Sequence, residues 1–324
     1  MFRYLIVQTI LLAMAFGTRQ ANGCLLSATV LPTKPSFIYG EPIELRVSLA
    51  NRNSKEIAVA VNYPSFQTHG LRGIRFTAEG GLTPRGGEDI NHEQLVGGRA
   101  LIQKIAAGDE WSVKLYLQTY FQSPAPGDYK LNYNLELPCL EADGTLKDTI
   151  KLEGTVSFTV GPANEGALQE VVKTYDRQLE STSFWELRTA AEALAAMDDP
   201  VVIPELTKLI KLGDSDLAFK TLARFKGNTE AETLVRSAIN SKKASTQLLA
   251  IDVWLKWKTA MPKAEFEMLL KAPERQVRLA ALRYARTVHA PGYLSLVKGV
   301  IDDQDPDVAK EARLTKQVLE RDMN

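Results

Sequence analysis

The periodicity of the apolar residues changes once along this 324-residue chain, close to Gly161. Before that point, short runs of β-branched and aromatic residues alternate with polar ones, which is the pattern of half-buried strands. After it, apolar residues recur at helical spacing, beginning with Leu168 and Val172. The length also exceeds the roughly 100–200 residues of one domain. The sequence therefore predicts two folding units, residues 24–161 and residues 162–324.

Eight strands are expected in the first unit, separated by turn residues such as proline and glycine. They are Leu25–Leu31, Ile43–Ala50, Ile57–Asn62, Gly73–Ala78, Leu101–Ile105, Trp111–Leu117, Tyr129–Leu137 and Ile150–Val160. In the second of them, aliphatic residues alternate with Glu44, Arg46 and Ser48, so one face should meet the core and the other should meet water. Short strands at this density predict an all-β sandwich.

Two segments of this unit resemble bacterial immunoglobulin-like domains. Tyr39–Ile43 leads into a strand that ends at Asn51, and Pro126–Tyr129 leads into a late strand. The second segment is similar to a tyrosine corner, in which a phenol hydroxyl binds the backbone beside a turn. The resemblance implies a β-sandwich but no particular activity, since this fold carries many functions.

A motif of about 30 residues recurs in the second unit, and it joins an aliphatic residue to a pair of small ones. Its aliphatic anchors are Leu187, Leu217, Leu248, Val277 and Val308. The copies Leu187–Ala191 and Val277–Ala281, with Asp305-Pro306-Asp307 before the last copy, resemble HEAT repeats of the type found in phycobilisome lyases. That resemblance implies an α-solenoid of about five helix pairs, each buried against its neighbours. Repeats alone do not transfer the lyase activity of some relatives.

The first 23 residues predict a cleavable signal peptide. Arg3 precedes the apolar run Tyr4–Phe16, and small or polar residues follow. A run of about 13 residues is too short to cross a hydrocarbon core of about 30 Å as a helix. Cleavage after Gly23 would leave Cys24 at the mature N-terminus, and cleavage after Gly17 is the alternative. We therefore expect a periplasmic or secreted protein.

The chain contains two cysteines, Cys24 and Cys139. In an oxidising compartment they should form a disulfide between the first strand and the end of a late one. The segment Ala21–Cys24 also resembles a bacterial lipoprotein acceptor site. In that alternative Cys24 carries a lipid that anchors the protein to a membrane, and Cys139 is a buried free thiol.

The charge is balanced over the whole chain, with 39 basic and 39 acidic residues, so no global field favours nucleic acid. Residues 236–298 depart from this balance, with 12 basic residues against 4 acidic ones. If these cations share a face, they would attract an acidic partner such as an anionic glycan, a lipid headgroup or an acidic protein segment. The candidate surface comprises Arg236, Lys242, Lys243, Lys256, Lys258, Arg275, Arg278, Arg283 and Arg286.

Trp254 and Trp257 lie within the same stretch and allow two interpretations. On the surface they would add stacking to the basic residues. Alternatively, both pack in the core and the lysines only solvate the outer face.

A Gly-rich loop at Glu79–Gly98 is the other candidate site, with Glu88, Asp89 and His92 as its chemically active residues. A long hairpin without a role is the alternative. No nucleophile-elbow, phosphate-loop or zinc-protease motif occurs elsewhere in the sequence. Asp303–Asp307 spaces its carboxylates as a calcium loop does, but the glycine and glutamate that complete such a loop are missing, so helix capping is expected instead.

Together these features predict an exported, non-catalytic binding or scaffolding protein without a metal or cofactor. Its expected partner is another envelope protein or an acidic ligand, with no nucleic acid, and with a membrane only if Cys24 is lipidated. The alternative is an enzyme or enzyme inhibitor that acts through the Gly-rich loop.

Overall fold

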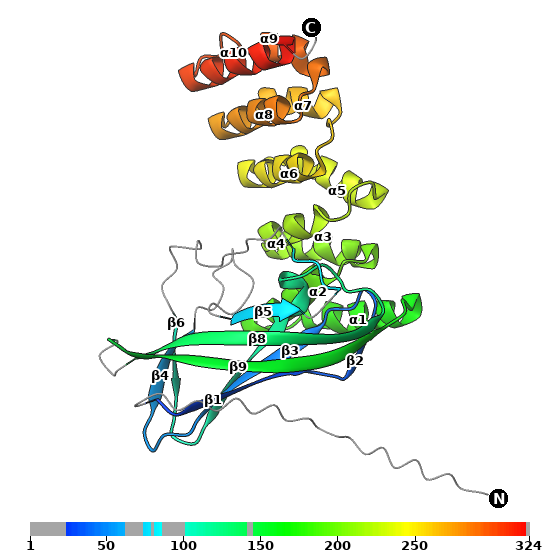
Figure 1. The fold of residues 1–324 in the computed structure, drawn as a ribbon. Coiled ribbons are helices and arrows are strands. Elements are labelled where there is room, and N and C mark those ends of the chain that lie inside the picture. Colours follow the sequence, from blue (N-terminus) through cyan, green and yellow to red (C-terminus); the bar gives the residue numbers. More distant parts are fainter. Residues whose placement is uncertain (1–23, 62–73, 79–80, 86–100, 141–144, 322–324) are drawn as a thin grey trace, which may run out of the picture. The chain divides into compact units, whose positions relative to one another are not determined.

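The computed structural model of the chain describes residues 24–61, 74–78, 81–85, 101–140 and 145–321. They form two compact units that divide between Asn164 and Glu165. The first unit contains the strands and the second contains the α-helices (Figure 1). A β region thus precedes a helical region, as the change in periodicity predicts, and the last strand ends at Gly161.

Nine strands form two sheets in the described part of the first unit. A three-stranded sheet has the order β1-β3-β7, and a six-stranded sheet has the order β2-β9-β8-β4-β6, with β5 paired to β8. Their bounds are β1 (Leu26–Pro32), β2 (Ser36–Ile38), β3 (Glu44–Asn51), β4 (Ile57–Val61), β5 (Ile74–Ala78), β6 (Leu101–Ile105), β7 (Glu110–Tyr116), β8 (Gly127–Leu140) and β9 (Leu146–Gly161). The eight predicted strands are all present. Only β2 was missed, because three residues are too short to show an alternation.

The prediction that one face of β3 meets water is wrong for most of the strand. Arg46 is exposed, but Glu44 and Ser48 are each only 8% exposed. The strand lies between β1 and β7, and the Glu44 carboxylate forms an ion pair with Lys114 Nζ at 3.0 Å. The face that the sequence pattern assigns to solvent is therefore largely buried at Glu44 and Ser48.

Cys24 and Cys139 form the predicted disulfide across 115 residues. Cys24 lies two residues before β1 of one sheet, and Cys139 lies on β8 of the other, so the bond ties the two sheets together. Both residues are buried among the aliphatic side chains of the core. Since both sulfurs are used in this bond, neither is free to carry a lipid or to remain a thiol.

The contact that the tyrosine-corner resemblance predicts is also present. Tyr129 Oη donates a hydrogen bond to the Ala125 carbonyl oxygen at 2.6 Å. The Tyr129 ring stacks on Phe158 of β9 with centroids 5.5 Å apart. The residue therefore joins the turn before β8 to the adjacent strand.

The second unit contains ten α-helices in the described residues. They are α1 (Glu165–Gln178), α2 (Phe184–Ala196), α3 (Ile203–Leu212), α4 (Ser215–Leu222), α5 (Thr229–Ile239), α6 (Ala244–Trp257), α7 (Lys263–Leu270), α8 (Arg275–Thr287), α9 (Leu294–Lys298) and α10 (Pro306–Arg321). Consecutive helices pack in pairs, and the even-numbered helices contact one another in the order α2, α4, α6, α8, α10. Figure 1 shows α6, α8 and α10 stacked in this order.

A column of small residues runs along the buried side of the even-numbered helices. Its members are no more than 1% exposed, and they are Ala191, Thr221, Ala250, Ala281 and Ala312. They recur at intervals of 30, 29, 31 and 31 residues. Small side chains let neighbouring helices approach closely. In four of the five helices the predicted aliphatic anchor lies four residues before the small residue of the column. In α6 the position four residues before Ala250 is Thr246, so the predicted anchor Leu248 is wrong by two residues.

Aspartates cap helices at two aspartate-proline steps, Asp199-Pro200 and Asp305-Pro306, and the second of these caps was predicted. Asp199 accepts a hydrogen bond from the Val201 amide at 2.9 Å, and Asp305 accepts from the Asp307 amide at 3.0 Å. Each carboxylate satisfies an amide that has no partner within its helix. No helix in the described ranges is both long enough and apolar enough to cross a bilayer.

Candidate functional site

The predicted loop site cannot be placed on this structure. Glu88, Asp89 and His92 all lie outside the described residues, and residues 81–85 are the described part of that Gly-rich loop. The loop hypothesis therefore stays a prediction.

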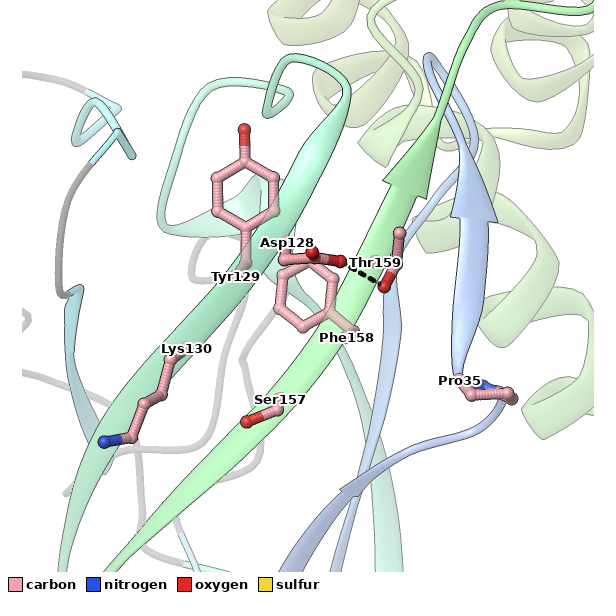
Figure 2. A pocket seen from close by; sticks show the side chains of 7 residues that line it. All are labelled: Pro35, Asp128, Tyr129, Lys130, Ser157, Phe158 and Thr159. Atoms are coloured by element: carbon pink, nitrogen blue, oxygen red, sulfur yellow. Dashed lines mark hydrogen bonds between the residues drawn. The ribbon is translucent and has the colours of Figure 1, made fainter. Parts of the chain in front are cut away.

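Two shallow hollows lie on the six-stranded sheet. The first, of about 460 Å³, lies over Pro35, β8 and β9 (Figure 2). Within it, Thr159 Oγ1 donates a hydrogen bond to Asp128 Oδ1 at 2.7 Å, while Lys130 and Ser157 point away from this pair. The side chains do not converge on one point, so we assign no chemistry to this hollow.

The second hollow, of about 550 Å³, is lined by polar residues of β5, β8 and β9. These residues largely bind one another across the strands. Thr155 Oγ1 donates to Asn132 Oδ1 at 2.9 Å, and Asn134 Nδ2 donates to Glu153 Oε1 at 3.3 Å. Such cross-strand pairs stabilise a sheet, and they involve four of the residues that line the hollow.

The predicted basic surface is largely neutralised by carboxylates. Five of its nine members form ion pairs within the described residues, in which Arg236 pairs with Glu265, Lys256 with Asp252, Arg275 with Asp305 and Asp307, Arg278 with Asp303, and Arg286 with Glu311. Three of these cations are paired by carboxylates that lie beyond residues 236–298 in the chain. The excess of positive charge in residues 236–298 therefore overstates the charge that is available to a partner.

The nine basic residues also lie on several elements rather than on one face. Arg236 is on α5, Lys242 and Lys243 precede α6, and Lys258 follows it. Three others, Lys256, Arg283 and Arg286, lie on the adjacent helices α6 and α8.

Trp254 and Trp257 belong to the core, as the packing interpretation predicts. They are 4% and 3% exposed, and their rings meet edge to face with centroids 5.2 Å apart. Trp257 Nε1 donates a hydrogen bond to the Ala223 carbonyl oxygen at 3.0 Å. Neither ring is available to stack on a ligand.

Sequence reasoning missed a mixed aliphatic and basic surface on the exposed side of α6, α8 and α10. We call it the α6–α8–α10 face, and it contains Leu248, Leu249, Leu255, Lys256, Leu279, Ala280, Arg283, Arg286, Lys310 and Leu314. Its aliphatic residues on α6 and α8 are half-buried, and Leu314 is 40% exposed. The available signal was that α6 carries leucines on the side away from its buried column. The repeat pattern assigns Leu248 to an aliphatic anchor instead.

A buried charge cluster joins α2 to the start of α4. Arg188, only 7% exposed, directs Nε to Glu192 Oε1 at 2.7 Å and Nη1 to Asp214 Oδ2 at 3.2 Å. Desolvation raises the pKa of Glu192, although the positive charge of Arg188 opposes this shift. Desolvation likewise raises the pKa of Asp214, again against the effect of Arg188. The cluster connects successive helix pairs, and we assign it a structural role.

Asp303–Asp307 acts in helix capping and ion pairing. Asp303 accepts a hydrogen bond from Arg278 Nη2 at 3.1 Å, and Asp305 caps the first turn of α10. The part of the chain that the structure describes holds no group of three or more potential metal ligands.

No protein-family model and no curated protein matches this chain. Among solved structures, an engineered protein is 17% identical, with 48% of this chain and 83% of that one covered and a TM-score of 0.31. Salmonella alpha-2-macroglobulin reacted with methylamine is 10% identical, with 91% and 26% covered and a TM-score of 0.24. AggA, the major subunit of aggregative adherence fimbriae type I from Escherichia coli, is 11% identical, with 44% and 97% covered and a TM-score of 0.22.

The chain spans only 26% of the length of that alpha-2-macroglobulin structure. Similarities at these identities and TM-scores identify neither a fold family nor an activity for this chain.

Proposed function

We propose that this protein is an exported binding protein that holds a partner on its helical unit. In this proposal the first unit is an immunoglobulin-like sandwich and the second is a HEAT-type solenoid. The α6–α8–α10 face carries the proposal, because it leaves aliphatic side chains half-buried beside cations on three adjacent helices. Protein interfaces join an apolar core to a polar, solvent-accessible rim, and this face offers both kinds of side chain.

Two observations support the solenoid assignment. The buried small residues recur every 29 to 31 residues, and each even-numbered helix contacts the next one. In addition, an arginine directly after the repeat anchor binds an aspartate that precedes the next even-numbered helix in two of the repeats. Arg188 binds Asp214 before α4, and Arg278 binds Asp303 before α10. Repeating contacts between neighbours stabilise a solenoid.

The immunoglobulin-like assignment is supported by two sheets that share one core, and by the Tyr129 hydrogen bond beside the turn before β8. Export is supported by the Cys24–Cys139 disulfide, since such bonds persist in oxidising compartments. The signal peptide proposed for residues 1–23 is the means of export.

Site-specific photo-cross-linking of the full chain in its native host tests this function. A photoreactive residue replaces either Gln276 of α8 or Ser237 of α5, both of which are exposed. A discrete cross-linked product in the envelope fraction, from at least one position, is the expected result. Absence of a product from both positions, or recovery of the protein with residues 1–23 in the cytoplasm, contradicts the proposal.

A further inference from the structure

The exposed sides of α6, α8 and α10 are related by the repeat. Two residues before the buried column stand Leu248, Leu279 and Lys310, and two residues after it stand Asp252, Arg283 and Leu314. The first two of these are half-buried, and the other four are exposed. Because the three helices are adjacent and share this register, equivalent positions lie on one continuous surface.

The first two repeats do not continue this surface. In α2, the residue two positions after Ala191 of the column is Ala193, which is fully buried. In α4, the residue two positions before Thr221 of the column is Phe219, which is 1% exposed. The mixed aliphatic and basic surface is therefore confined to the last three even-numbered helices. A surface of this extent suits a short segment of a partner rather than the whole length of the unit.

The net charge of the α6–α8–α10 face stays positive when the carboxylates that pair with its cations are included. Asp252 pairs with Lys256 at 2.9 Å, and Glu311 pairs with Arg286 at 2.9 Å. Arg283 and Lys310 form no ion pair with a carboxylate of the described residues, and both are exposed. Two cations without an ion pair among the described residues thus lie beside the aliphatic side chains of this face.

These observations select among anionic partners. A sulfated or acidic glycan has no aliphatic side chains to set against those of this face, and both tryptophans of this region, which could stack on a sugar ring, are buried. A bilayer needs several apolar side chains that protrude, whereas Leu314 is exposed and the aliphatic residues of this face on α6 and α8 are half-buried. A polypeptide segment can place aliphatic side chains against those of this face and carboxylates against Arg283 and Lys310.

We infer that the α6–α8–α10 face binds an acidic polypeptide segment of another protein that also carries aliphatic side chains. This inference rests on the proposed binding function of the helical unit and names its partner class. Aliphatic contacts supply the affinity, and the two cations supply the preference for an acidic sequence and steer its approach.

Fluorescence anisotropy of the full chain with labelled synthetic peptides tests this inference. The main probe is a peptide of glutamate, leucine and alanine, and its comparisons are the same peptide with lysine for glutamate, and polyglutamate. Vesicles that contain phosphatidylglycerol and a sulfated polysaccharide are tested alongside, to detect a lipid or glycan partner.

The diagnostic variant combines Arg283→Glu with Lys310→Glu. Its matched control combines Lys242→Glu with Lys243→Glu, which makes the same charge change in the turn before α6. A second variant, Leu314→Ser, removes an aliphatic side chain that is already 40% exposed, so it leaves the fold intact. Circular dichroism confirms that all variants remain folded.

We expect the glutamate, leucine and alanine peptide to bind. The Arg283→Glu, Lys310→Glu variant should weaken binding about tenfold or more, the control less than about threefold, and Leu314→Ser measurably. Equal binding of polyglutamate, equal loss in the control, binding only of vesicles or polysaccharide, or no binding of any probe would each overturn the inference. A cross-linked product from Gln276 or Ser237 in such a case would leave the proposed function standing with a partner of another kind.

Discussion

Tyr133 of β8 lies directly over Gly154 of β9, its partner in the strand register. A Cβ atom at Gly154 would be 2.5 Å from Tyr133 Oη and 2.6 Å from Cζ. Tyr133 is itself only 3% exposed, so its ring cannot swing into solvent without leaving the core. We predict that Gly154→Ala lowers the free energy of unfolding of the β unit by about 1–3 kcal/mol, measured by urea denaturation.

Gly161→Ala is the matched control for this substitution. Its added Cβ would meet only the Phe37 carbonyl oxygen at 3.6 Å, an ordinary contact. Equal stability losses in the two variants would show that the Tyr133 contact is not the cause.

The Cys24–Cys139 disulfide should contribute strongly to stability. Closing a loop of 115 residues restricts the unfolded chain, which corresponds to about 5 kcal/mol in the chain-entropy model. A Cys24→Ala, Cys139→Ala variant is expected to unfold at a clearly lower temperature by calorimetry. Reducing agent should lower the melting temperature of the natural chain and leave that of the variant unchanged. A reducible shift in the variant as well would contradict this prediction.

Arg188 should be among the most sensitive positions of the helical unit. Arg188→Met leaves the carboxylates of Glu192 and Asp214 without their shared cation, and losing one partner of a buried pair costs about 3–5 kcal/mol. Arg313→Ala is the control, because its ion pair with Asp302 is exposed and should contribute about 0–1 kcal/mol. Denaturant unfolding followed by the helical circular dichroism signal compares the two. Similar losses would mean that Arg188 is not an essential link between α2 and α4.

The same cluster predicts a pH dependence. Burial raises the pKa of Glu192 above its usual value of 4.5, so the folded protein holds this proton to a higher pH than the unfolded chain does. Folding therefore takes up a proton between the two pKa values, and the contribution of Glu192 to stability falls as the pH rises through that window. Asp214, whose pKa is also raised, acts in the same direction.

Glu192→Gln keeps a hydrogen-bond acceptor for Arg188 but cannot titrate. Relative to this variant, the natural protein should lose stability as the pH rises above the usual glutamate pKa of 4.5. The difference in unfolding free energy between the two proteins should become constant at lower pH. Unfolding curves of both proteins above and below this pH measure the effect. Parallel stability profiles would contradict the prediction.

Several features of the fold follow from residues close together in the sequence. The alternation in segments such as Ile57–Val61 depends on the two-residue period of a strand, which neighbouring residues alone reveal. The turn before β8 and the Tyr129 hydrogen bond four residues back are equally local. The disulfide was predictable for a different reason, since two cysteines allow one pairing within the molecule.

The repeat register was harder to predict because one helix breaks its own pattern. In α6, aliphatic residues lie both at the buried column beside Ala250 and on the exposed side at Leu248. Periodicity cannot distinguish the two sides of such a helix, and only the packing of α4 and α8 against it identifies the buried one.

The sequence by itself determined the order of a β region and a helical region, most of their elements and the covalent link between the two sheets, because these depend on local periods and on a single cysteine pair. The tertiary structure alone decided which charges are available to a partner. Arg278 and Asp303 are 25 residues apart in the chain yet form a hydrogen bond, while Arg283, five residues beyond Arg278, stays exposed. Electrostatic attraction acts between neighbours in space, and no linear count of charge contains that information.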